Sequence, residues 1–171
     1  IEEALTLGDH VQVIQDGALI DAGNPVATLT QPNSIEIAQL TGVENILELE
    51  VAELLPKEGI IIARFGNTLI LEVPYKKVEA GTTVSVGIKA SDIIFATKKP
   101  ETSALSARNI LPGTVKTIEK TAVGYEVLIE SKDGLLLNGH ITRRSLEQLN
   151  VQVGDSLWSI FKTSALFILD N

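Results

Sequence analysis

The chain has no cysteine, no methionine and only two histidines among its 171 residues. The missing cysteines exclude disulfide bridges, thiolate metal ligands and cysteine nucleophiles. His10 and His140 are too few for a metal site built on histidine. No apolar run approaches the ~18 residues that a membrane-spanning helix needs, so we do not expect the chain to cross a bilayer. What remains is the ordinary composition of a globular chain, 44% apolar and 21% charged.

The charge is acidic and unevenly distributed. The net charge of −8 comes from 22 acidic and 14 basic residues. Residues 1–100 carry 14 acidic and 7 basic side chains, whereas residues 101–171 carry 8 and 7. Non-specific binding of nucleic acid needs a basic face, and base stacking needs aromatic side chains, which make up only 4% here. Any bound anion must therefore be held by a local set of donors.

Ten short β-branched or alternating segments follow residue 45, separated by glycine-containing turns. They predict strands at 46–53, 59–65, 68–73, 83–88, 92–97, 113–120, 123–131, 134–141, 156–162 and 165–169. Two groups of five strands favour a mainly β fold of two tandem small barrels. The polar segment 98–104, which contains a proline, is predicted to be the linker between them.

The two groups of strands are repeats of each other. The recurring residues are Gly81, Val84, Lys89 and Ser91, found 73 positions later as Gly154, Leu157, Lys162 and Ser164. Asn45-Ile46-Leu47 recurs 64 positions later as Asn109-Ile110-Leu111. The difference of nine residues is an insertion, and it falls at 142–150. This insertion is typical of a short helix with Thr142 at its N-cap.

The first 44 residues do not share the strand pattern of the two repeats. They predict a helix end at 2–7, strands at 11–15 and 18–21, and a helix over 25–40 that is interrupted at Pro32. A hairpin and a broken helix cannot bury their own apolar faces. We therefore expect this segment to belong to a domain that is mostly missing, and the chain, which begins at Ile1, to be a piece of a longer protein.

Segments of this N-terminal part resemble the last part of an ABC-transporter nucleotide-binding domain. They are Glu2–Val11, Gln15–Gly17 and Gly23–Pro25. The resemblance implies that the histidine contacting the ATP γ-phosphate lies upstream of this sequence. Neither a Walker A loop nor the Ser-Gly-Gly signature of that family occurs. We therefore expect no ATP binding, no hydrolysis and no cofactor in this fragment. By resemblance, ATP and magnesium belong to the missing domain of a parent ATPase, which works with permease subunits at the cytoplasmic face of the membrane.

The second repeat resembles the molbindin (Mop) domain over about 65 residues. The matching residues are 106–115, Ile141, Thr142, Ser145, Leu149, Gly154, Asp155 and 162–164. The resemblance implies a small oligonucleotide/oligosaccharide-binding (OB) type barrel, related to the TOBE domain, that pairs between subunits in oxyanion importers. It therefore implies a homodimer. The domains expected are 1–44, the end of the ATPase domain, 45–100, a degenerate first repeat with Glu44 in place of Arg108, and 101–171, the second repeat.

A candidate oxyanion site follows from the second repeat. Molybdate and tungstate are tetrahedral dianions, which need hydrogen-bond donors and positive charge. The donors offered are Ser106, the Ala107 amide, Arg108, Lys162, the Thr163 amide and Ser164, with Thr142, Arg143 and Ser145 as candidates across a subunit boundary. Each charge-assisted bond contributes about 1.5 to 3 kcal/mol. The alternative is that Arg108 and Lys162 form ion pairs while Ser106 and Asn109 cap the start of a strand.

Three functions remain open at this point. The leading hypothesis is a regulatory region that senses imported molybdate or tungstate for an ABC importer. The second is a dimerisation or structural TOBE module, without bound ligand, in an importer of another solute. The third is an oligonucleotide or sugar binder, which the acidic charge disfavours. The sequence shows no catalytic constellation.

Overall fold

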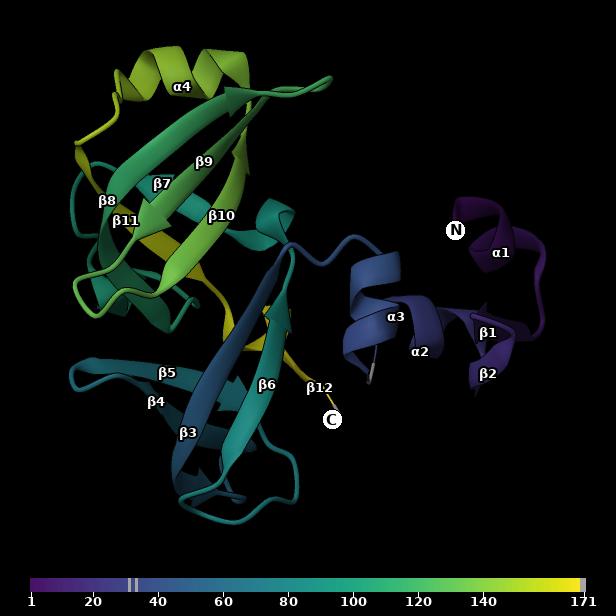
Figure 1. Cartoon of the computed structure of the whole chain (residues 1–171). Coiled ribbons are helices and arrows are strands. Elements are labelled where there is room, and N and C mark those ends of the chain that lie inside the picture. Colours follow the sequence, from purple (N-terminus) through teal and green to yellow (C-terminus); the bar gives the residue numbers. More distant parts are fainter. Residues whose placement is uncertain (31, 33, 170–171) are drawn as a thin grey trace.

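The protein, described here as a computed structural model, consists of a small N-terminal segment and two five-stranded sheets (Figure 1). The structure describes residues 1–30, 32 and 34–169. The mainly β fold expected from the sequence is confirmed. None of the described helices is long and apolar enough to span a membrane.

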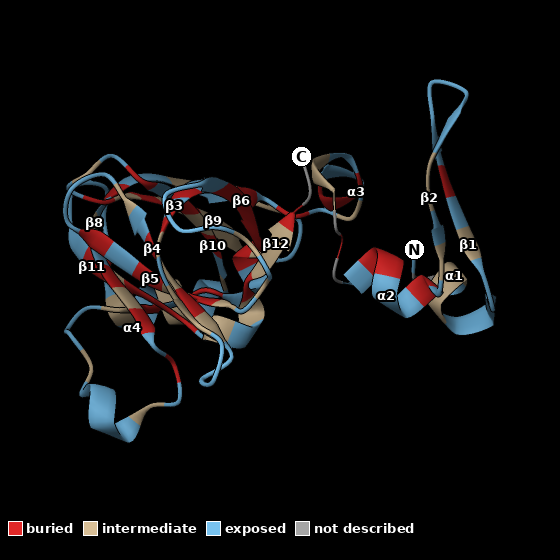
Figure 2. Ribbon diagram, turned by 90° about the horizontal axis from the view of Figure 1, so that it is seen from below, coloured by how far each residue is buried: buried red, intermediate tan, exposed pale blue. Residues whose placement is uncertain are grey.

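The N-terminal segment leaves part of its apolar surface exposed. Its elements are α1 (Glu2–Leu7), β1 (Val11–Gln15), β2 (Ala18–Gly23), α2 (Pro25–Thr30) and α3 (Ile35–Leu40). Asp16 and Gly17 take positive φ values at the hairpin turn. Leu7 is 82% exposed and Ile14 is 64% exposed. In Figure 2 the hairpin extends away from the sheets, and most of it is coloured as exposed.

The first sheet is built mainly from the first repeat. Its strands are β3 (Asn45–Leu55), β4 (Ile60–Phe65), β5 (Leu69–Pro74), β6 (Thr83–Ile88) and β12 (Phe167–Leu169), in the order β12-β6-β3-β4-β5. Alternate residues of β3 point inward, so Leu47, Leu49 and Val51 are buried. This alternation is the period-two pattern by which the sequence predicted the strand.

The second sheet repeats this plan. Its strands are β7 (Ile94–Ala96), β8 (Asn109–Lys120), β9 (Tyr125–Glu130), β10 (Leu136–Ile141) and β11 (Ser156–Phe161), in the order β10-β9-β8-β11-β7. Helix α4 (Arg143–Leu149) fills the insertion, and the Thr142 side chain accepts a hydrogen bond from Ser145 N at 3.1 Å. The short capped helix predicted for the insertion is confirmed.

The two repeats exchange their last strands, which the sequence did not reveal. The prediction grouped 92–97 with the first repeat's strands and 165–169 with the second's. In the structure β7 pairs with β11 of the second sheet, and β12 pairs with β6 of the first. Figure 1 shows teal β7 within the green sheet and yellow β12 beside β6. Both repeats carry the same apolar pattern, so the pattern predicts each strand without specifying its partner.

The chain crosses between the sheets through two short 3₁₀ helices, η1 (Ala90–Asp92) and η3 (Thr163–Ala165). A third, η2 (Thr102–Ala104), lies in the predicted linker. Buried side chains of both repeats, such as Leu49 and Val127, belong to one contiguous cluster. The two repeats therefore share one hydrophobic core.

The tips of two hairpins meet at the junction of the repeats. The Asp133 carboxylate, between β9 and β10, accepts hydrogen bonds from the amides of Thr68 at 3.0 Å and Leu69 at 3.1 Å, and a further one from the Thr68 hydroxyl. The hydroxyl bond is the main reason why the pKa of Asp133 lies below its usual value. The ionised carboxylate therefore holds the two tips together.

This contact predicts a loss of stability in acid. Because the folded-state pKa of Asp133 is depressed, its contribution is fully present above the unfolded value of ~3.9 and is lost as the pH falls below it, through the folded pKa. We expect Asp133→Asn to lower the urea midpoint at pH 7 and to show a smaller further fall at pH 3 than the wild type. Asp9→Asn, at an exposed carboxylate of the N-terminal segment, is the control and should follow the wild type. Parallel pH profiles for Asp133→Asn and the wild type would contradict the assignment.

Candidate functional site

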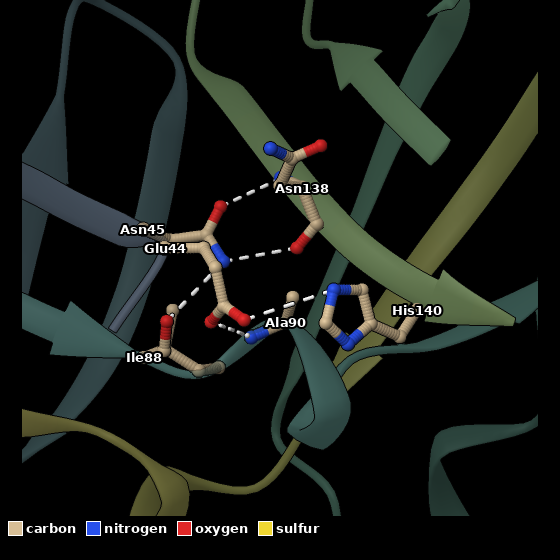
Figure 3. A network of polar contacts seen from close by, with 6 residues as sticks. All are labelled: Glu44, Asn45, Ile88, Ala90, Asn138 and His140. Atoms are coloured by element: carbon tan, nitrogen blue, oxygen red, sulfur yellow. Dashed lines mark hydrogen bonds and ion pairs between the residues drawn. The ribbon is translucent and has the colours of Figure 1, made fainter. Parts of the chain in front are cut away.

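Two buried asparagines fix the strand starts on which the candidate site is built. Asn45 donates to the carbonyls of Ile88 at 3.2 Å and Asn138 at 2.9 Å, and accepts from Asn138 N at 2.6 Å (Figure 3). Asn109 accepts from Glu72 N and donates to Glu72 O, both at 2.9 Å. Each asparagine thus binds the edge strand of the other repeat, β10 or β5. Residues 44 and 108, immediately before them, are thereby held at the junction of the repeats.

The second-repeat site brings together two segments that are distant in the sequence. Asn109 of β8 pairs with Phe161 of β11, so one residue further along the ladder Arg108 lies opposite Lys162. Ser106, Ala107 and Lys162 line one cavity of about 350 Å³. The other residues of its wall are Ser91, Asp92, Ile94, Leu105, Ile160, Phe161 and Ala165. Residues of both repeats, among them two serines and one lysine, therefore line the same cavity.

Three of the predicted site residues do not line this cavity. The exposed Arg108 guanidinium donates to the carbonyls of Leu105 at 3.2 Å and Thr102 at 3.5 Å, and Arg108 does not line the cavity. The Thr163 hydroxyl lies 3.5 Å from a carboxylate oxygen of Glu72. Ser164 lines two other cavities, of about 350 and 130 Å³. The structure thus brings Ser106, Ala107 and Lys162 together and holds Arg108, Thr163 and Ser164 around them.

The residues predicted to act across a subunit boundary lie at the start of α4. The hydroxyls of Thr142 and Ser145 are 2.9 Å apart, and Arg143 Nε donates to Glu147 at 2.8 Å. That bond raises the pKa of Arg143. Thr142 also lines a cavity of about 190 Å³ together with Ser91, from η1 of the first repeat. Thr142 therefore neighbours the first repeat of its own chain, and its role towards a partner chain stays a prediction.

The equivalent position of the first repeat holds a network of polar contacts (Figure 3). One carboxylate oxygen of Glu44 accepts a hydrogen bond from Ala90 N at 2.9 Å, and the other lies 3.7 Å from His140 Nε2. Since Asn45 pairs with Ile88, Lys89 lies opposite Glu44 one residue beyond the ladder. His140 therefore contacts a carboxylate and joins the two repeats.

Sequence reasoning missed three residues around these cavities. Ser91 and Asp92 reach the wall beside Lys162 because the strands are exchanged. Lys76, at the end of β5, lines a cavity with Ser164, and its Nζ lies 3.5 Å from the carbonyl of Ile168. The signal that was present is the repeat itself. The repeat does not show which strands of the two units pair, so it could not place these residues beside the cavities.

The comparisons with known proteins agree with this architecture. The model of the TOBE domain matches residues 105–168. The molybdate/tungstate import ATP-binding protein WtpC of Pyrococcus horikoshii is 32% identical over 167 residues, which cover 98% of this chain and 44% of that protein. The molybdenum import ATP-binding protein ModC of Rhizobium meliloti is 26% identical over 166 residues, which cover 97% of this chain and 46% of that protein.

A solved structure extends the likeness to three dimensions. The cytoplasmic molybdate-binding protein ModG, in a form with molybdate bound, superposes with a TM-score of 0.66 and 27% identity, covering 75% of this chain and 97% of that one. The chain spans less than half the length of the two import proteins. The domain match shows that residues 105–168 form a TOBE domain, and nearly the whole chain is similar to part of ABC-transporter ATP-binding subunits for molybdate and tungstate import.

Proposed function

We propose that this chain is the regulatory C-terminal region of an ABC importer's ATP-binding subunit and that it binds a tetrahedral oxyanion, molybdate or tungstate. The observation that carries the proposal is the convergence of Ser106, Ala107 and Lys162 on one cavity. The names of the relatives, and the molybdate in ModG, supply the class of ligand.

The cavity offers the donors that such an anion needs. Lys162 supplies a positive charge, and Ser106 and Ser91 supply hydroxyls. Arg108 follows the last pair of the ladder beside Lys162, and in the proposal its side chain turns from the carbonyls of its own linker towards the anion. Ser91 belongs to the first repeat and Ser106 to the second. An anion bound between them stabilises one arrangement of the two repeats.

Regulation then follows from the difference in affinity between two arrangements of the whole subunit. An anion that binds one arrangement more tightly shifts the population towards it, by no more than that difference allows. In this proposal the anion signals that enough has been imported, and the attached ATPase domain is inhibited. The subunit acts at the cytoplasmic face of the membrane with permease partners, as a homodimer.

Calorimetric titration of this chain with molybdate, tungstate and sulfate tests the proposal. We expect saturable binding of molybdate and tungstate, with sulfate weaker. If no heat of binding is detected for molybdate or tungstate, the sensor function fails. Equal affinity for sulfate would mean a general anion site with no selectivity for the heavier oxyanions.

A second candidate function is a dimerisation module without ligand. Two observations favour it, namely the hydrogen bonds that turn Arg108 towards its own linker and the carboxylate of Asp92 in the cavity wall. The calorimetric titration separates the two functions, whereas sedimentation with and without tungstate tests the pairing that both functions share. We expect a mass of two chains in both conditions, because oligomers of this kind are usually closed and two-fold. A mass of one chain at tens of micromolar would contradict pairing in either function.

The Asp92 carboxylate predicts a gain in affinity on its removal. Asp92 occupies the position that Ala165 holds in the second repeat, 73 residues later, and both line the cavity. Because like charges repel, Asp92→Asn should tighten tungstate binding by about 1 kcal/mol, roughly fivefold, and less at high salt. Calorimetry at two salt concentrations measures the change, with Asp9→Asn as the control. Unchanged affinity would place the anion away from this wall.

A further inference from the structure

The first repeat carries a carboxylate at the point where the second repeat carries a cation. Glu44 and Arg108 are 64 positions apart and are equivalent, as are Ala90 and Thr163, 73 positions apart. The amide of Thr163 belongs to the donors predicted for an oxyanion. In the first repeat the corresponding Ala90 amide donates to Glu44 at 2.9 Å. The backbone amide that corresponds to a predicted anion donor is therefore already hydrogen-bonded to a carboxylate of the same chain.

The surroundings of the Glu44 carboxylate are those of a bound anion. One oxygen accepts the Ala90 amide and the other faces the His140 imidazole at 3.7 Å. His140 comes from β10 of the second repeat, so the carboxylate is held from both repeats (Figure 3). Lys89 follows the last pair of this ladder, Asn45 with Ile88. An amide and an imidazole are donors that a protein also offers to an external carboxylate or oxyanion.

We propose that the Glu44 carboxylate is a built-in ligand that fills the anion position of the first repeat. It is tethered, so its effective concentration at the Ala90 amide is high and a free anion has to displace it. If Glu44 fills the first position, the chain has one open oxyanion site and not two. This consequence rests on the proposed function. The side chains of Glu44 and His140 are 30% and 41% exposed, so a small anion can enter once the carboxylate is removed.

A formate titration followed by the NMR signal of the Ala90 amide tests occupancy directly. In Glu44→Ala, we expect this amide to shift saturably, with an apparent affinity at least about tenfold higher than in the wild type, because the tethered competitor is gone. Glu44→Gln is the matched variant. Its side-chain oxygen still accepts from the Ala90 amide, so this signal should not respond. The Thr163 amide reports the equivalent position of the second repeat.

Three results would overturn the inference. The first is an Ala90 signal in Glu44→Ala that ignores formate, and the second is an equal response in the wild type. The third is a response in Glu44→Gln as large as in Glu44→Ala, which would mean that charge repulsion and not occupancy closes the position. Unchanged signals elsewhere establish that the variant is folded, and Glu44→Ser takes its place if Glu44→Ala does not fold.

The number of molybdate ions bound per chain provides a second, independent test. We expect one anion per chain in the wild type and two in Glu44→Ala. If the wild type binds no molybdate, the proposed function fails while the formate result still decides the role of Glu44. If the wild type binds two, Glu44 does not close the first position and the inference fails alone.

Discussion

Replacing Asn109 by alanine should lower the free energy of unfolding by about 2 to 4 kcal/mol, since the substitution leaves two partly buried backbone groups without a partner. Asn109 is 1% exposed, and its amide group satisfies both the N–H and the carbonyl of Glu72, at 2.9 Å each. These bonds join β8 to β5 of the other repeat. For a chain of this size, the loss corresponds to a fall in the melting temperature of roughly 5 to 15 °C, which urea and thermal unfolding both measure.

Two variants serve as controls for this prediction. Asn45→Ala should have a cost of the same order, because Asn45 is 5% exposed and makes the equivalent bonds to Asn138. Asn138→Ala should cost less than about 1 kcal/mol, because it contacts Asn45 through its backbone N and O, which the substitution retains. A cost for Asn109→Ala no larger than for Asn138→Ala would show that the clamps between the repeats do not stabilise the fold.

Much of the secondary structure could be predicted because it is a local property of the chain. Alternation of apolar and polar residues identified β3 and the strands that follow it, and Thr142 identified the start of α4. The start of β8 was the main error in strand boundaries. The predicted strand began at Gly113, whereas in the structure β8 already begins at Asn109 and Pro112 pairs with Trp158. A Cβ at Gly113 would lie 2.2 Å from Ile129, so glycine here permits close approach of β9.

The relation between the repeats could not be predicted, because it depends on contacts that no local pattern encodes. The exchange of β7 and β12 moves Ser91 and Asp92 beside Lys162 and Ser164 beside Lys89. It also gives Asn109 a partner in the other repeat, where the sequence offered strand capping as the alternative role. The sequence therefore predicted the site residues of the second repeat and missed those that the first repeat contributes.

The second large effect concerns Lys162. If the oxyanion binds in the cavity of about 350 Å³, Lys162→Ala removes the positive charge of its wall and should weaken tungstate binding by about 2 to 4 kcal/mol, roughly 30- to 1,000-fold. Arg108→Ala should weaken binding by less, about 1 kcal/mol, because this side chain first has to leave the carbonyls of Leu105 and Thr102. Calorimetric titration of each variant measures both losses.

Lys89→Ala is the matched control, because Lys89 is the repeat equivalent of Lys162 and lies opposite Glu44 and not opposite an arginine. It should leave tungstate affinity unchanged, since the neighbouring carboxylate repels a dianion and already uses the Ala90 amide. Arg108 and Lys162 are exposed and Lys89 is half-buried, so each substitution should change stability by less than about 1 kcal/mol and a loss of binding is not a loss of folding. Equal losses for Lys89→Ala and Lys162→Ala would mean that the anion sits on the pseudo-two-fold junction between η1 and η3, and not in the cavity lined by the second repeat.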